Sequence, residues 1–135
     1  MSLVQSLRNR AILVEKNVSL AATSGTTVGI SVPAGSLVLA AGFENTTVVP
    51  DITTYTMDIT DGVTVFADDL NFDNAAAGSI KAGSTVGVVT TADTIDVVTT
   101  ISGSTGVIAG RVWAVIVDCN GTGSTAAEVD RDQLA

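Results

Sequence analysis

Side chains suited to catalysis are scarce in this chain, and histidine is absent. Without histidine, the most common general base, the most common zinc ligand and the Ser–His and Cys–His nucleophile pairs are all missing. A hydrolase with paired carboxylates would need two acidic side chains that face each other in a cleft. The carboxylates cluster in predicted turns, and aromatic residues, which usually line a glycosidase cleft, make up only 4% of the chain. We therefore expect neither an enzyme nor a bound cofactor.

One acidic segment begins like a calcium-binding loop. Asp69, Asn71 and Asp73 place oxygen ligands at its first, third and fifth positions. The match then ends, because Asn74 stands where the loop needs glycine and Ile80 stands where it needs a bidentate glutamate. We favour an acidic surface loop, and a looser cation site at Asp69, Asn71 and Asp73 stays an open alternative.

Two further side chains have both a functional and a structural interpretation. Trp113 could stack on a sugar ring, but it lies inside the apolar run Val112–Val117, which favours a core position. Cys119 has no second cysteine to pair with, and it follows the same run. A free cysteine in such a place is most often a small buried hydrophobe. We therefore predict core positions for both.

The composition predicts a β-rich domain. Hydrophobic residues make up 46% of the 135 residues and charged residues only 15%, which excludes disorder as the main state. Valine and threonine dominate and favour pleated sheets over helices. The 13 glycines indicate frequent turns. A chain of this length fits one domain with a core of its own.

The charge of the chain restricts its partners. The formal net charge of −8 argues against binding to nucleic acid or to an anionic membrane. The longest apolar stretch, Val107–Val117, contains Arg111 and is too short to span a membrane. Because nothing resembles a signal peptide, we expect folding in a reducing cytoplasm. Arg8, Arg10 and Lys16 give the N-terminus a basic character, which suits an acidic protein partner but equally a solvated terminus.

Alternation of apolar and polar residues predicts the strands. Thr26–Asn45 is predicted as a strand, a turn with Pro33 at its second position and Gly35 at its end, and a second strand. Alternation would place one set of side chains of each strand on the buried face, namely Val28, Ile30 and Val32, then Leu37, Leu39, Ala41 and Phe43. Thr54–Thr60 has the cleanest alternation, with its apolar odd-numbered residues on one face. Asp61-Gly62 then predicts a two-residue hairpin turn before a strand at Val63–Phe66.

The rest of the chain divides in the same way. Further strands are predicted at Ala11–Glu15, Val18–Ala22, Thr85–Thr91, Thr94–Ile101 and Val107–Val117. Thr85–Thr91 and Thr94–Ile101 would form a hairpin, and Val107–Val117 would be a central strand buried on both faces. Ala67–Gly83 would be a long surface loop. Eight to ten strands at regular spacing are typical of a sandwich or barrel. We predict residues 1–10 as an N-terminal arm, 11–119 as an all-β, antiparallel β-sandwich domain and 120–135 as a polar C-terminal tail.

Four passages, taken in order, resemble small virion proteins of tailed bacteriophages, including phages of cyanobacteria. The passages are SVPAGSLVLAAGFENTTVV, YTMDITDGVTVFADD, TADTIDVVTT and GRVWAVIVDC. In such proteins a PAG turn opens one strand, an alternating strand ends in a Gly/Asp turn, and an apolar strand containing WA closes the domain. The resemblance covers about Val28–Cys119. It is a pattern of strands and turns and contains no catalytic motif.

The resemblance implies a jelly-roll-like β-sandwich that assembles as a homotrimer. Its implied function is that of a non-enzymatic capsid decoration, or cement, protein, which binds the outer face of the major capsid protein lattice and stabilises the head. The alternative is a head or tail fibre module that binds a host surface glycan or another virion protein. The expected partners are the major capsid protein and further copies of the chain. The expected location is the outer capsid surface of the virion, after synthesis in the host cytoplasm.

The N-terminal arm is an addition to the minimal domain of these proteins. It would anchor the protein to the shell or to a neighbouring subunit, for example by adding a strand to an exposed sheet edge. The residues expected to make this contact are Leu3, Val4, Leu7, Arg8 and Arg10.

Overall fold

The computed structural model describes residues 11–20, 23–47, 54–73, 75–91, 93–102 and 108–118. Within these ranges the chain forms nine strands. Their bounds are β1 Ile12–Leu20, β2 Gly25–Val32, β3 Ser36–Asn45, β4 Thr54–Thr60, β5 Val65–Asn71, β6 Ile80–Gly83, β7 Gly87–Val89, β8 Asp93–Ser102 and β9 Ile108–Asp118. Among the residues with described structure, no helix has the length and apolarity needed to cross a membrane.

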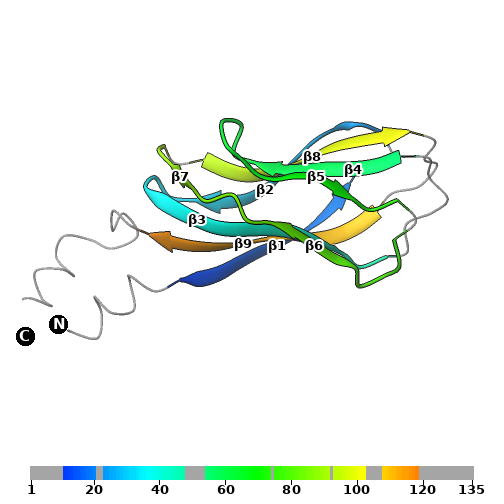
Figure 1. The fold of residues 1–135 in the computed structure, drawn as a ribbon, viewed down its shortest axis with the longest axis horizontal. Helices are drawn as coiled ribbons and strands as arrows, with labels where there is room; N and C mark the ends of the chain where they lie inside the picture. Colours follow the sequence, from blue (N-terminus) through cyan, green and yellow to red (C-terminus); the bar gives the residue numbers. More distant parts are fainter. Residues whose placement is uncertain are drawn as a thin grey trace, which may run out of the picture.

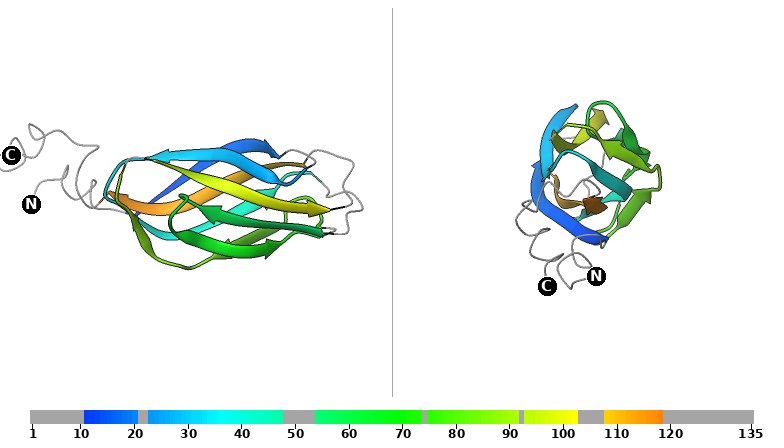
Figure 2. Two further views of the ribbon diagram at one scale, coloured as in Figure 1. Left: turned by 90° about the horizontal axis from the view of Figure 1, so that it is seen from above. Right: turned by 90° about the vertical axis from the view of Figure 1, so that its left-hand side faces the viewer.

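Two antiparallel sheets pack face to face in an elongated sandwich (Figures 1 and 2). One sheet has the order β1-β9-β3-β6, with β7 also paired to β3, and we call it the β9 sheet. The other has the order β2-β8-β4-β5, and we call it the β8 sheet. The predicted fold, an all-β, antiparallel and jelly-roll-like sandwich, is confirmed.

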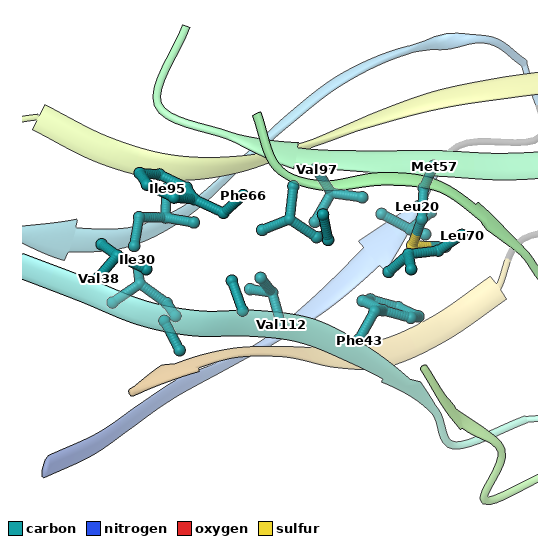
Figure 3. Close-up of a cluster of buried hydrophobic side chains, with 14 of the residues drawn as sticks. Leu20, Ile30, Val38, Phe43, Met57, Phe66, Leu70, Ile95, Val97 and Val112 are labelled. Carbon is teal, nitrogen blue, oxygen red and sulfur yellow. The ribbon is translucent and has the colours of Figure 1, made fainter. Parts of the chain in front are cut away.

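The hydrophobic core fills the space between the two sheets (Figure 3). Tyr55, Met57 and Ile59 of β4 point inward and are buried, as their alternation predicts. Phe43 of β3 packs edge-on against Phe72, with ring centroids 5.6 Å apart. Because fully burying one large apolar side chain contributes roughly 1.5–3 kcal/mol, this aliphatic and aromatic layer is the main source of stability.

The predicted unit of strand, turn and strand at Thr26–Asn45 is present as β2 and β3. The N–H of Ser36 donates to the carbonyl of Pro33 at 3.2 Å, and Gly35 has a φ of 81°. Pro33 is therefore the first residue of the turn, not the second, and Gly35 occupies the position that requires positive φ. The two strands do not pair with each other, because β2 pairs with β8 and β3 with β9. The turn thus carries the chain from one sheet to the other.

Irregular register in β2 and β3 places some side chains on the opposite face from the one predicted. The pairing of β2 shifts just before Ile30, and the pairing of β3 shifts just after Val38. Val28 is consequently 57% exposed, although it alternates with the buried Ile30. Likewise Val38 is buried while Leu39 is only half-buried. A bulge adds one residue to one strand and so changes the phase of the alternation.

Two predicted turns and loops differ from the structure. The β4–β5 connection spans four residues, because Asp61 Oδ1 accepts hydrogen bonds from the N–H groups of Val63 and Thr64 at 2.9 and 2.7 Å. In addition, β5 and β6 occupy much of the segment predicted as a loop at Ala67–Gly83. Gly83 permits this close packing, since a Cβ there would lie 2.5 Å from the Cα of Ala67.

Two predicted strand arrangements are also wrong. The expected pair of short strands at the start of the domain is the single strand β1, which pairs with β9 over its whole length. Its polar Lys16 and Asn17 are exposed on an edge strand and do not interrupt it. The expected hairpin of β7 and β8 is absent as well, because β7 pairs with β3 in the β9 sheet.

Several predictions lie outside the described residues. They are the arm at residues 1–10, the tail at 120–135 and the buried position of Cys119. These, and the division of the chain that depends on them, stay predictions.

Candidate docking face

The outer face of the β9 sheet presents apolar side chains in rows that run across its strands. The first row lies at the end of the sheet where β1 begins, and the second row follows it. The first row consists of Val88, Leu37 and Val117, and the second row consists of Ala40, Val115 and Leu13. Leu13 is 62% exposed and Val88 is 47% exposed. We call this surface the docking face, because no described part of the chain covers these two side chains.

Trp113 lies on the docking face and not in the core. Its side chain is half-buried, whereas its neighbours Val112 and Ala114 point inward and are buried. The predictions of a core tryptophan and of a strand buried on both faces are therefore wrong. The indole lies over Gly42 of β3, where a Cβ would be 2.6 Å from Trp113 Cζ2. Glycine on the adjacent strand thus provides the space that the ring occupies.

Beside Trp113, Arg111 forms ion pairs with glutamates of the two neighbouring strands. Its Nη1 lies 3.6 Å from Oε1 of Glu15 on β1, and its Nη2 donates to Oε1 of Glu44 on β3. The hydrogen bond to Glu44, followed by the charge of Glu15, raises the pKa of Arg111 above its already high ordinary value. The guanidinium therefore stays charged, and with two carboxylates around it the group has a formal charge of −1.

These side chains enclose a surface hollow of about 350 Å³. It is lined by Leu13, Glu15, Glu44, Ile80, Arg111 and Trp113, and we call it the Trp113 hollow. A more polar hollow of about 300 Å³ lies further along the same sheet, lined by Asn17, Val18, Ser19, Thr46, Ala109 and Gly110. An apolar centre beside a charged and polar margin is the usual composition of a protein-binding surface.

An acidic cluster lies on the β8 sheet. Carboxylate oxygens of Asp58, Asp68 and Asp69 lie within 4.8 Å of one another. Repulsion by Asp69, followed by that of Asp58, raises the pKa of Asp68. Of the three residues considered for a cation site, Asp69 belongs to this cluster. The Oδ1 atoms of Asn71 and Asp73 instead accept hydrogen bonds from the backbone N–H groups of Asp73 and Tyr55. The structure therefore groups Asp69 with different partners from those that the sequence indicates.

The residues predicted to bind a partner, Leu3, Val4, Leu7, Arg8 and Arg10, lie outside the described residues. Their contact stays a prediction. The segment that contains them precedes β1, which begins at the apolar end of the docking face. The face itself was not predicted, although the run of apolar residues on both sides of β9 was an available signal.

Comparison with known proteins identifies structures of the same fold. Neither the models of protein families nor the curated proteins give a match. A chain of the cyanophage Pam1 capsid asymmetric unit is similar with a TM-score of 0.61 and 15% identity, over 78% of this chain and 83% of that chain. A chain of the acidic stable capsid of Helicobacter pylori bacteriophage KHP30 has a TM-score of 0.52 and 15% identity, over 78% and 91%. The chain is thus a β-sandwich of a kind that also occurs in phage capsids.

Proposed function

We propose that this chain is a non-enzymatic structural protein of a bacteriophage virion, and specifically a decoration protein on the outer surface of the head. The observation that carries the proposal is the likeness of its fold to two chains from phage capsids, which extends over 78% of this chain in both cases. The proposed partners are the major capsid protein lattice and further copies of this chain, assembled as a trimer.

The docking face supports this proposal on physical grounds. Contiguous apolar surface on a folded domain usually marks a site of interaction, because its exposure to water is unfavourable. Many copies, each with a modest contact, would hold a shell together through avidity. If the protein binds the assembled lattice but not the free capsid subunits, its binding would stabilise the lattice by mass action. The net charge of −8 would also keep the protein from binding packaged DNA.

Heating particles that contain or lack this protein tests the proposal. Particles without it should assemble but release their DNA at a lower temperature, because the shell loses the added contacts. Release can be followed with a dye that fluoresces on free DNA. Equal release temperatures for the two kinds of particle would contradict a stabilising role.

Two valines on opposite sheets provide a matched pair of variants. Val88→Asp introduces a charge on the docking face, whereas Val28→Asp introduces the same charge on the β8 sheet at a residue that is similarly exposed, 57% against 47%. We expect Val88→Asp to reduce binding to particles at least tenfold and Val28→Asp to leave it unchanged. Equal binding of both variants would show that this part of the face does not contact the shell.

The position of Trp113 favours one alternative, a fibre or appendage module that binds a host glycan. A half-buried indole beside Arg111, Glu15 and Glu44 combines a stacking surface with polar groups. Copy number separates the two functions, because a decoration protein is present in hundreds of copies per particle and a fibre module in a dozen or fewer. Quantitative gel analysis of purified particles measures it.

A further inference from the structure

We propose that the Trp113 hollow binds residues 1–10 of a neighbouring copy of this chain. The contact would link copies directly, with or without a capsid. It can therefore be tested on the purified protein, and its failure would leave the proposed binding to the capsid lattice untouched.

The composition of the segment matches that of the hollow. Residues 1–10 contain three large aliphatic side chains besides Met1, two arginines and no acidic residue. The hollow offers exposed apolar surface at Leu13 and Ile80, which are 62% and 60% exposed, together with the face of Trp113. Arg111 and its two glutamates leave a formal charge of −1 at the margin of the hollow. An arginine of the segment would find a carboxylate there, while its leucines cover the apolar wall.

The charge of the whole chain favours contact through this segment. Because the full chain has a net charge of −8 and Arg8 and Arg10 contribute +2, the other residues together have a net charge of −10. Two such bodies repel each other at close range. A basic segment that extends from one copy onto the acidic body of another reduces this repulsion where the copies meet.

The position of the hollow favours a neighbouring copy over the segment's own chain. Leu13 and Glu15 line the hollow only a few residues after the segment ends at Arg10. To place Leu7 over its own Trp113, the chain would have to reverse direction within Arg8–Ile12, where Asn9 is the only residue of a type that favours turns. If the segment instead continues in the direction of β1, its ten residues span up to about 33 Å, which is enough to reach the face of an adjacent molecule.

Trp113 is the only tryptophan of the chain, so its fluorescence reports on the hollow alone. In the full-length protein we expect acrylamide to quench Trp113 weakly and light scattering to give the mass of an oligomer. Leu7→Asp should increase the quenching constant at least twofold, shift the emission to longer wavelength and reduce the mass to that of a monomer. The control Val63→Asp changes a residue that is 91% exposed in the β4–β5 turn, and it should change neither readout. Arg8→Glu combined with Arg10→Glu tests the charged part of the contact, and circular dichroism confirms that each variant folds.

A mixing experiment distinguishes a neighbour's segment from the chain's own. The Leu7→Asp variant keeps its tryptophan, and an excess of full-length Trp113→Phe protein supplies an intact segment without any tryptophan signal. Recovery of protection from acrylamide on mixing is the expected result. The proposal is overturned if wild-type and segment variants are quenched equally. It is also overturned if the wild type is protected but mixing restores nothing, since the segment would then bind within its own chain.

Discussion

The outer faces of the two sheets differ in composition, although the sheets enclose the same core. On the β8 sheet, polar residues of the two central strands point outward, among them Thr56, Asp58 and Thr100, and exposed valines occur on the edge strands. On the β9 sheet, the corresponding surface carries Leu13 and Trp113. The first face is suited to water, whereas the second has the composition of a surface that another layer covers. A strand that is apolar on both sides is therefore not by itself evidence that its own domain covers both faces.

The largest expected effect concerns the glycine beneath Trp113. In Gly42→Val the new side chain would meet the Trp113 ring and the carbonyl of Lys81, so either the ring or the strand must move. We expect the free energy of unfolding to fall by about 1–3 kcal/mol, the range typical of overpacking. Chemical denaturation followed by Trp113 fluorescence measures the change.

The β8 sheet supplies the control for that variant. Gly25 begins β2, and a Cβ there would have no heavy atom within 4 Å. Gly25→Val should therefore leave stability within about 0.5 kcal/mol of the wild type. If both substitutions cost the same, the loss would reflect glycine in strands generally and not the packing of the indole on the docking face.

A smaller effect is expected at the ion pairs of the docking face. Arg111→Met removes the cation between Glu15 and Glu44, so the two carboxylates repel each other without compensation. We expect the midpoint of thermal unfolding to fall by about 2–4 °C at low salt, the scale of a modest loss in a small domain. The deficit should shrink in 1 M NaCl, because salt screens exposed charges.

Lys16 on β1 is the matched cation for this comparison. It lies on the same pair of strands, and the ion pairs of the described part of the chain do not include it. Lys16→Met should change the midpoint by less than half as much as Arg111→Met. Equal losses would show that the general charge of the sheet matters and the specific pairs do not.

The difference between the two outer faces also explains which buried residues the sequence predicts correctly and which it does not. The alternation in β4 predicts its buried residues correctly, because a polar outer face makes the pattern unambiguous. The same logic fails for β9, where half-buried Trp113 and Val115 resemble core residues in the sequence. Alternation identifies apolar faces, but it does not specify which of two apolar faces the domain itself covers.

Pairing between strands is the second property that sequence analysis did not supply. Strand positions follow from local composition, and β2, β3, β4, β8 and β9 were placed nearly correctly. Their partners depend on contacts between distant segments, as in the pairing of β7 with β3. The Trp113 hollow likewise depends on contacts between distant segments, since Leu13, Ile80 and Trp113 come from three strands that are far apart in the chain. Bulges after Val38 and before Ile30 added phase shifts that no local pattern marks.

The smallest expected effect concerns the acidic cluster of the β8 sheet. Repulsion by Asp69 and Asp58 raises the pKa of Asp68, so the folded state binds its proton more readily than the unfolded state does. Stability therefore falls as the pH rises from the ordinary aspartate pKa of about 3.9 through the raised value in the folded state. Asp68→Asn removes this penalty. We expect a rise in the unfolding midpoint of about 1 °C at pH 7, the scale of an exposed charge change.

The pH dependence of this gain distinguishes repulsion from other effects of the substitution. Below about pH 3.5 Asp68 is mostly protonated in both states, so the variant and the wild type should unfold at the same temperature. Asp93→Asn serves as the control, because Asp93 is exposed on the same sheet but lies outside the cluster, and its Oδ1 accepts the N–H of Thr94. A gain at Asp68 that persisted at low pH, or an equal gain at Asp93, would contradict the cluster as its cause. A gain confined to neutral pH would show that repulsion between exposed carboxylates lowers the stability of the polar face. On the apolar face the unfavourable contribution is instead the exposure of side chains such as Leu13 to water.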